Sequence, residues 1–481
     1  MKVAAIDYII IVAYLVAIAI FGKFKGGKQK TVKDYFLGSK QISWWVISFS
    51  IVAAETSTLT FISIPGLAYL TNLNFLQLTF GYLLGRIIVA VYFLPAYHKG
   101  ELFTAYTYLQ NRFGDKTRSF ASIVFLFTRT ASDGVRLFAT AIPLYLLLDV
   151  SPIFAIIIIA GVALMYTYTG GLKGVIWVDA IQMFIYLGGA LLAGFYLINL
   201  LPGGINSIFS NPAVSSKLSV INWGFDSGVA GFFSQPYTLI SGIVGGAFLS
   251  MSSHGTDQLI VQRLLAAKSL SDSRKVIIST GVMVIIQFVI FLLLGVLLFA
   301  YYGNLDIRAD EIFPKFIIEV LPAGIRGIII AGLFAAALST LAGSITSLSS
   351  STMMDLYLPF KPNLDEKKNL LLSRLFTVFW SAMLILSAVI FMESPKSVVE
   401  LALSIASFTY GGLLGTFLLG LLNKKAKQED ALAGFTSGIF VMIAVIALKL
   451  VAWTWFILIG VCVTLIVGSL LAALTKTKSL R

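Results

Sequence analysis

The stretch that decides the fold is Ser50-Ile-Val-Ala-Ala-Glu-Thr-Ser-Thr-Leu-Thr-Phe-Ile-Ser-Ile-Pro-Gly66, which lies in the middle of a long apolar run. An acid, Glu55, and the hydroxyl side chains that follow it are costly inside a membrane unless they have a function. Pro65-Gly66 loosens the helix beyond them, and a broken helix exposes backbone carbonyl groups. Carbonyl, hydroxyl and carboxylate oxygens together suit a hard cation such as sodium. The alternative is a packing face of Thr and Ser with a proline kink, which the buried acid disfavours.

The rest of the chain has the composition of a membrane protein. Of its 481 residues, 58% are hydrophobic and 12% are charged, and the charged share is about half that of soluble domains. So few charges cannot cover the outside of a soluble globule, which excludes soluble enzymes and secreted binding modules. Apolar runs long enough to cross a hydrocarbon core about 30 Å thick predict an all-α polytopic membrane protein with about thirteen transmembrane helices. These lie near 6–22, 44–70, 76–96, 119–148, 152–169, 175–200, 232–256, 274–302, 325–354, 370–392, 397–421, 430–451 and 454–474.

The basic residues predict how the chain is oriented. The 35 Lys and Arg residues exceed the 22 Asp and Glu residues, and they lie mostly in short loops between apolar runs. No basic stripe alternates with exposed aromatic residues, so nucleic-acid binding is not expected. If the loop over 23–40 is cytoplasmic, 25 basic residues lie inside and 6 lie outside. We therefore expect a multi-pass protein of the cell membrane with its N-terminus outside and its C-terminus in the cytoplasm.

Polar residues interrupt a second predicted helix, over 232–256. The stretch from Ser250 to Gln258 is polar, and Gly255 permits a backbone break. This position in the second half mirrors the Glu55 break in the first half, and paired broken helices are typical of a central transporter site. His254 is expected to hydrogen-bond at the break, because no partner with metal-ligand spacing accompanies it.

A hydroxyl cluster lies in the predicted helix over 325–354. Ser339 and Thr340 are adjacent there, at a depth where they could face the first break. The alternative is a stripe of small residues that allows close helix packing.

Further ionisable residues lie within apolar runs. Asp179 either pairs with Lys173 or belongs to a cation path. Arg129, Asp133 and Arg136 share one face of a helix. They form either an internal ion pair with a surplus positive charge or an anchor for a substrate carboxylate.

Six stretches of the sequence resemble the sodium/solute symporter family, which includes bacterial proline, galactose and sialic acid symporters and mammalian glucose, iodide and monocarboxylate symporters. They are Asp34-Tyr-Phe-Leu-Gly38, Thr60-Phe-Ile-Ser-Ile-Pro65, Tyr108-Leu-Gln-Asn-Arg-Phe113, Gly171-Leu-Lys-Gly-Val-Ile-Trp-Val-Asp-Ala-Ile-Gln182, Gln262-Arg263 and Asp355-Leu-Tyr357. The resemblance implies a LeuT-type fold of two inverted five-helix repeats. The repeats would span 44–200 and 232–421, with a leading helix and basic loop over 1–43, an extracellular loop over 201–231 and two trailing helices over 422–481.

The resemblance also implies a site for sodium (Na+). Its ligands would be the carbonyl groups of Ala53, Thr56 and Ala336 and the hydroxyl groups of Ser339 and Thr340. Asp179 matches an acid of the family, and Glu55 falls where the proline symporters have an essential acid, so we assign both to the cation path.

The resemblance does not extend to all of the sites of the sialic acid symporters. Their second sodium site uses two serines where this chain has Ala342 and Gly343, and their substrate arginine and glutamine align with Ser132 and Thr79. Recognition of sialic acid is therefore not implied.

We expect the solute to bind near the midplane, between the two breaks and opposite the helix with the arginines. Two arginines against Asp133 leave one positive charge over, which favours a carboxylated solute. The expected substrate-binding residues are Ser57, Thr60, Phe75, Gln77, Thr79, Arg129, Ser132, Arg136, Ser253, Asp257 and Gln258.

Together these features predict a sodium-coupled symporter that imports a small polar organic solute by alternating access. Its partners would be sodium, the solute and the lipid bilayer, without nucleic acid or an obligate protein partner. The alternative is a sodium-dependent channel or solute sensor with the same fold, which uphill uptake would distinguish. An enzyme or a nucleotide-driven pump is disfavoured, because the sequence has no Gly-rich phosphate loop and no visible nucleophile–base pair.

Overall fold

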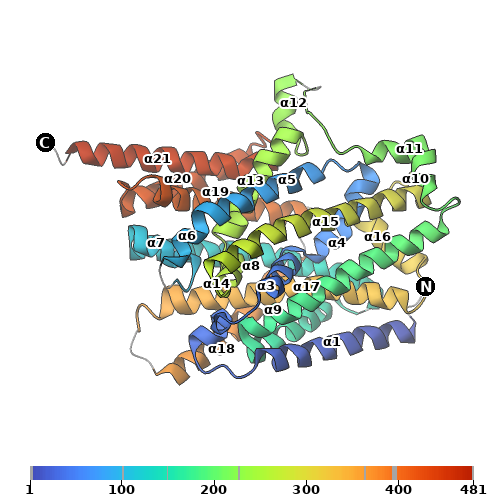
Figure 1. Cartoon of the computed structure of the whole chain (residues 1–481), viewed down its shortest axis with the longest axis horizontal. Helices are drawn as coiled ribbons and strands as arrows, with labels where there is room; N and C mark the ends of the chain where they lie inside the picture. The colour runs from blue at the N-terminus through green and yellow to red at the C-terminus, as the bar shows by residue number, and fades with distance from the viewer. Residues whose placement is uncertain are drawn as a thin grey trace.

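The computed structural model describes residues 4–99, 102–148, 150–225, 228–361, 365–392 and 398–478, and it is built from helices. Most of the long helices run along one direction (Figure 1). The elements of the first half are α1 (Ala5–Gly26), α2 (Val32–Leu37), η1 (Gly38–Lys40), α3 (Trp44–Glu55), α4 (Thr58–Leu70), α5 (Leu76–Ile88), η2 (Val89–Phe93), α6 (Leu94–His98), α7 (Ala105–Phe113), α8 (Asp115–Leu148) and α9 (Pro152–Leu200).

The second half begins with short helices in the connection after α9. Its elements are α10 (Asn206–Ser210), α11 (Pro212–Ser215), η3 (Ser216–Leu218), α12 (Gly228–Ser234), α13 (Leu239–Gly255), α14 (Gln258–Leu265), α15 (Leu270–Tyr302), α16 (Ala309–Glu319), α17 (Ile325–Ser351), η4 (Thr352–Tyr357), α18 (Glu366–Phe391), α19 (Val398–Leu422), α20 (Gln428–Ala447), η5 (Trp453–Trp455) and α21 (Phe456–Lys478).

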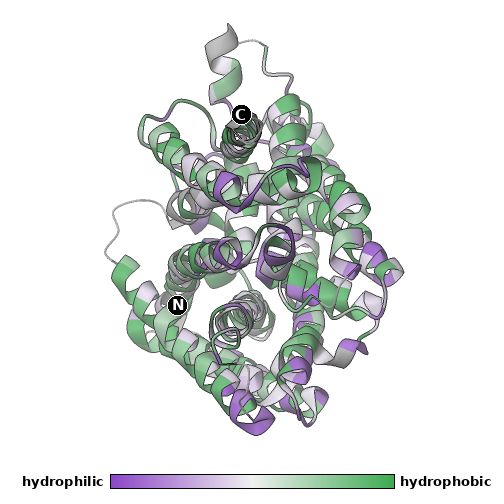
Figure 2. Cartoon of the chain, turned by 90° about the vertical axis from the view of Figure 1, so that its left-hand side faces the viewer, coloured by the Kyte–Doolittle hydropathy of each residue, from purple (hydrophilic) through white to green (hydrophobic). Residues whose placement is uncertain are grey.

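Within the described ranges, eight helices are long and apolar enough to cross a membrane. The bent pair of α3 and α4 adds a ninth span if it is taken as one. The helix α9 is bent at Gly171, whose φ of 55° is left-handed, so it contains two of the predicted segments. Hydrophobic residues predominate along the helices (Figure 2), and many large hydrophobic side chains are exposed on the outside of the bundle. The membrane character is thus confirmed, whereas the count of about thirteen helices stays a prediction.

Both predicted helix breaks are present. The helix α3 ends at Glu55 and α4 begins at Thr58, and the two helices are bent by 67°. Ser57 caps α4, because its side chain accepts a hydrogen bond from the backbone N–H of Thr60. In the second half α13 ends at Gly255, and Asp257 caps α14 by accepting from the backbone N–H of Leu259 at 2.8 Å.

The helix α17 lies at the centre of the bundle. Nearly all of its residues are buried, and it packs against α9, α1, α8 and α18. Small residues such as Ala336 and Gly343 allow its neighbours to approach closely. The start of α17 is fixed to α1, because Asp7 pairs with Arg326 at 2.9 Å and also accepts from the backbone N–H groups of Gly324 and Gly327.

Glycines bring α5 and α13 into direct backbone contact. A Cβ atom placed on Gly81 would lie 2.4 Å from the carbonyl oxygen of Ile243, and one on Gly246 would lie 2.3 Å from that of Leu78. The pairs Gly81/Gly85 and Gly242/Gly246 repeat every four residues, which is the spacing of close-packed membrane helices. This crossing holds the first helix after the α3/α4 break against the helix that carries the second break.

We expect Gly81→Ala to destabilise the fold, because the new methyl group would overlap backbone atoms of α13. The expected loss is about 1–3 kcal/mol, typical of overpacking, and thermal unfolding of the purified protein in detergent measures it. Gly161→Ala is the matched control, since no atom lies within 4 Å of the Cβ position of this α9 glycine. Equal melting temperatures for the two variants would contradict the close crossing.

Candidate functional site

A cavity of about 420 Å³ lies between the two helix breaks, within the usual range for small-molecule sites. The first break contributes Glu55 and Ser57 to its wall, and the second contributes His254 and Asp257. The helices α4, α8, α15 and α16 also contribute, and the aromatic wall consists of Phe75, Tyr82, Tyr237, Phe288, Tyr410 and Trp453. Polar groups at the breaks and aromatic rings around them suit a small polar solute.

The expected sodium ligands lie on α3 and α17 beside the first break. The Oγ1 of Thr340 donates to the carbonyl oxygens of Ala336 at 3.2 Å and Ala54 at 3.4 Å, so oxygens from both helices meet there. Because α3 ends at Glu55, the carbonyl groups of its last three residues, including that of Ala53, lack helical N–H partners. Thr56 follows as the C-cap residue, with non-helical backbone.

Ser339 supplies the clearest sign of a ligand in this region. Its side chain is fully buried, and its Oγ lies beside the Asp179 carboxylate but makes no hydrogen bond of regular geometry. The Oδ1 atom of Asp179, which is also fully buried, has none either. Buried polar groups are rarely left unsatisfied. Neutral oxygens with one nearby carboxylate form a donor set that fits a sodium ion.

Asp179 is held by an arginine rather than by Lys173. Its Oδ2 accepts from Arg263 Nη2 at 2.9 Å and from Ser50 Oγ at 2.7 Å. Three elements therefore meet at this carboxylate, namely α9, α14 and α3. The lysine considered from the sequence as a structural partner is the wrong one, because pairing depends on how α14 packs against α9 and not on distance along the chain.

Glu55 joins the two breaks. Arg86 Nη2, on α5, lies 2.6 Å from both carboxylate oxygens, and His254 Nε2 lies 3.5 Å from Oε2. His254 stands one residue before the end of α13. The Glu55 carboxylate thus has a cationic partner that the sequence did not assign to it, although Arg86 was visible as a charge within an apolar run.

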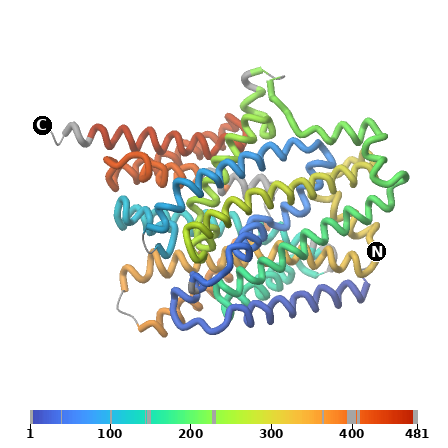
Figure 3. The backbone as a smooth tube through the Cα atoms, in the orientation of Figure 1, coloured from blue at the N-terminus to red at the C-terminus, as the bar shows by residue number. Residues whose placement is uncertain are grey.

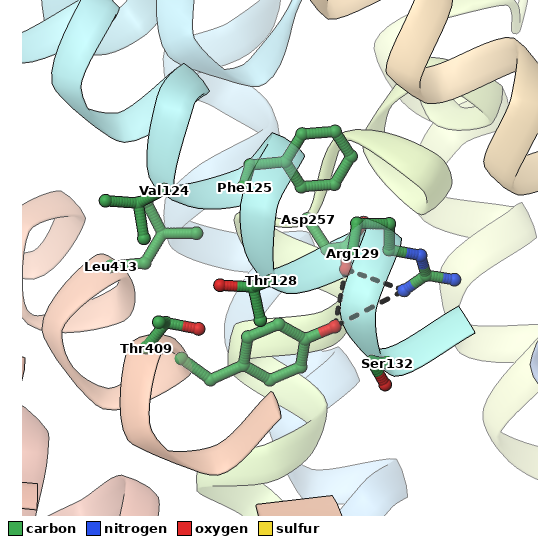
Figure 4. A pocket seen from close by; sticks show the side chains of 9 residues that line it. Val124, Phe125, Thr128, Arg129, Ser132, Asp257, Thr409 and Leu413 are labelled. Carbon is green, nitrogen blue, oxygen red and sulfur yellow. Dashed lines mark hydrogen bonds and ion pairs between the residues drawn. The ribbon is translucent and has the colours of Figure 1, made fainter. Parts of the chain in front are cut away.

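The arginines of α8 form a row of alternating charges with two acids, and we call Arg136, Asp133, Arg129 and Asp257 the charge row. Asp133 lies 3.2 Å from Arg136 Nη1 and 2.5 Å from Arg129 Nε. Arg129 Nη1 in turn lies 3.1 Å from Asp257 Oδ2, and Figure 4 marks this contact with a dashed line. The expected surplus of positive charge is therefore wrong, because Asp257 balances the second arginine.

The side chains of the charge row differ in their exposed fraction. The side chain of Arg136 is 26% exposed, compared with 9% for Arg129, 2% for Asp257 and 0% for Asp133. Arg136 has one ion pair, at 3.2 Å, to an acid that Arg129 already holds more closely. Both predicted arginines line the cavity, and Arg136 is the more exposed of the two.

Most of the expected substrate-binding residues line the cavity, and four do not. Those on its wall are Ser57, Thr60, Phe75, Arg129, Arg136, Ser253 and Asp257. Gln77 is fully buried and bonds to backbone groups of Tyr237 and Asn222, and Thr79 donates to the carbonyl of Leu76. Gln258 accepts from the backbone N–H of Ala105. These three side chains bond to groups within the protein and do not line this cavity, so their role in binding a solute stays a prediction.

Ser132, the fourth, lines a much smaller second cavity, together with Thr128 (Figure 4). Arg129, Asp257 and Tyr410 line both cavities, so these three residues separate them.

Several cavity residues were not predicted from the sequence. Asp310 of α16 accepts a hydrogen bond from Ser63 Oγ at 2.6 Å, and Tyr410 of α19 donates to Asp257 Oδ2 at 2.5 Å. Gln287 of α15 donates to Thr56 Oγ1 at 2.7 Å. Of these three residues, only Gln287 could have been recognised from the sequence as a candidate, because it is a polar residue in the middle of an apolar run. Asp310 lies in a predicted loop, and a tyrosine such as Tyr410 is common in helix packing.

The sequence pattern described as "Sodium:solute symporter family" matches residues 35–438. The sodium/sialic acid symporter NanT of Aliivibrio fischeri is 28% identical, over 98% of this chain and 94% of the relative. The sodium-coupled monocarboxylate transporter 1 of Homo sapiens is 28% identical, over 90% and 72% of the respective chains.

A solved structure is also similar over the whole chain. It is a Na+-coupled sialic acid symporter in a substrate-bound outward-open state, with a TM-score of 0.88, 27% identity and 98% coverage of both chains. The structural likeness confirms the LeuT-type fold.

We expect Glu55→Gln to destabilise the protein by about 3–5 kcal/mol, because it leaves the fully buried Arg86 guanidinium without a counter-ion. Thermal unfolding of the purified variant measures the loss. The double variant Glu55→Gln/Arg86→Gln should recover much of the stability, since it removes both charges. A double variant that is as unstable as Glu55→Gln would show that Arg86 is not the partner that matters.

Proposed function

Because this chain belongs to the sodium:solute symporter family and is a sodium-coupled symporter, we propose that it imports a small solute that carries a carboxylate. The solute would bind in the cavity between the two breaks, and sodium would bind beside the first break on α3 and α17. The observation that carries the solute class is the partly exposed Arg136 side chain on the cavity wall. An arginine presents paired N–H donors that match the geometry of a carboxylate.

Two further observations support a carboxylated solute. The other charged groups of the row are paired with one another and more deeply buried, so Arg136 is the open cation of the row. Two of the relatives named above are transporters of sialic acid and of monocarboxylates. Aromatic residues such as Phe75 and Trp453 would contact the remainder of the solute.

We assign the sodium ion to the carbonyl groups of Ala53, Thr56 and Ala336 and the hydroxyl groups of Ser339 and Thr340, with Asp179 and Glu55 on the cation path. The buried Ser339 Oγ and Asp179 Oδ1 support this assignment, because neither atom makes a hydrogen bond of regular geometry. A bound cation would hold α3 against α17 and thereby favour one state of the alternating-access cycle. Movement of one sodium charge across the membrane would add about 2.3 kcal/mol per 100 mV.

The membrane topology is part of the proposal. We place the protein in the cell membrane with its N-terminus outside and its C-terminus in the cytoplasm. The start of α1 and the end of α21 lie at opposite ends of the bundle (Figure 3), which agrees with an odd number of spans. The proposed repeats, 44–200 and 232–421, each contain a broken helix near their start, α3/α4 in the first and α13/α14 in the second.

We expect Ser339→Ala and Thr340→Ala each to raise the sodium concentration needed for half-maximal uptake at least ten-fold. Loss of one oxygen ligand from a dehydrated ion should cost more than the ~1.4 kcal/mol that corresponds to a factor of ten. Uptake into proteoliposomes at varied sodium measures this. The matched control is Ser349→Ala on the same helix, where the hydroxyl is equally buried but donates to the carbonyl of Ile345. Unchanged sodium dependence in both variants would refute the assigned site.

We expect Arg136→Gln to weaken binding of carboxylated solutes at least ten-fold, because glutamine keeps hydrogen-bonding capacity but removes the charge. Sodium-dependent thermal stabilisation by monocarboxylates, sialic acid, sugars and polyols measures the preference. Arg136→Lys, which keeps the charge, should retain part of the carboxylate binding. Stabilisation by sugars or polyols alone, in the wild type and both variants, would rule out the carboxylate proposal.

A further inference from the structure

Asp257 bonds to the kind of groups that a solute carboxylate would be expected to find in this cavity. Its Oδ2 accepts from Arg129 Nη1 at 3.1 Å and from the Tyr410 hydroxyl at 2.5 Å. A guanidinium together with a phenolic hydroxyl forms a strong donor pair for a carboxylate. Asp257 lies on the wall of the main cavity and is almost fully buried. The protein's own carboxylate therefore occupies a carboxylate-binding pair beside the solute.

This contact determines how many cations the cavity offers. Arg129 is shared between Asp133 and Asp257, so both of its acidic neighbours are protein groups. Arg136, seven residues or about two turns further along α8, is left as the more exposed arginine. A solute with one carboxylate finds one open cation, whereas a second carboxylate would meet Asp257 instead of a free Arg129.

The second oxygen of Asp257 has a different task. Its Oδ1 accepts from the backbone N–H of Leu259 and caps α14. Asparagine is as good an N-cap residue as aspartate, so Asp257→Asn keeps the cap and removes the charge. The two tasks of this residue can therefore be separated by experiment.

We propose that Asp257 is a specificity-determining residue that acts as an internal carboxylate: it occupies Arg129 and so restricts the cavity to solutes with one carboxylate. The inference rests on the proposed solute class and deepens it. Removal of the charge exposes Arg129 as a second cation. The site then accepts a dicarboxylate, whose two groups reach Arg136 and Arg129.

The test compares two anions of equal chain length, butyrate with one carboxylate and succinate with two. Binding to purified full-length protein in sodium is measured as a shift of the melting temperature over a titration. We expect the wild type to bind butyrate at least ten-fold more tightly than succinate, and Asp257→Asn to narrow or invert this ratio by at least ten-fold. Asp257→Ser also keeps a capping oxygen and should behave in the same way, so poor folding of one variant leaves the other to decide.

Two controls show whether the effect passes through Arg129. Arg129→Gln added to Asp257→Asn should restore the preference for butyrate, because no second cation remains. Thr128→Val alters a buried group of the smaller cavity without a change of charge and should leave the ratio as it is. An unchanged ratio in Asp257→Asn and Asp257→Ser would overturn the proposal.

The outcomes also separate this inference from the proposed solute class. If Arg136→Gln still binds carboxylates, Arg136 is not the residue that binds the solute carboxylate. The role of Asp257 is then decided by the comparison of butyrate with succinate. A wild type that binds neither anion refutes the solute class. In that case, succinate binding gained in Asp257→Asn still supports the internal carboxylate, and its absence overturns it.

Discussion

A helix that breaks inside a membrane must find partners for the backbone groups that it frees, because hydrocarbon offers none. This constraint governs the arrangement of the whole bundle. The α3/α4 break is capped by Ser57 and lies against α17, where Thr58 Oγ1 donates to the carbonyl of Leu333. The α13/α14 break is capped by Asp257. The burial of α17 at the centre and the glycine crossing of α5 and α13 both follow from the need to enclose these breaks in protein rather than in lipid.

Buried ion pairs are the second constraint on the arrangement of the helices, because the burial of a charged side chain without a partner costs several kcal/mol of free energy. The pairs join elements that are distant in sequence: Asp7 with Arg326, Glu55 with Arg86 and Asp179 with Arg263. Each pair fixes one helix of the first half against a helix of the second half or against a neighbour of a break. A pair of this kind specifies one arrangement more than it adds stability, which suits a protein whose helices must return to defined positions after each transport cycle.

The sequence predicted those features that depend on one segment at a time. Apolar runs gave the helices, and polar interruptions gave both breaks within a few residues. It did not predict features that depend on the packing of two segments. The partner of Asp179 is Arg263 and not the nearby Lys173, and Asp257 balances Arg129 from a different helix. Gln77 and Thr79 lie on α5, whose neighbour Phe75 lines the cavity, but their side chains bond to backbone groups within the protein. The periodicity of the sequence does not distinguish this role from contact with a solute.

The short helix α14 lies between the proposed sodium and solute sites. Asp257, at its start, bonds to Arg129 on the cavity wall, and Arg263, near its end, bonds to Asp179 beside Ser339. All eight residues of α14 are buried, so it cannot shift at one end without disturbing its packing at the other. Coupling between two ligands requires an element whose position both of them influence. At the proposed sites, a cation near Asp179 would weaken the hold of that acid on Arg263, and a carboxylate near Arg129 would compete with Asp257, so both ligands would act on the same helix.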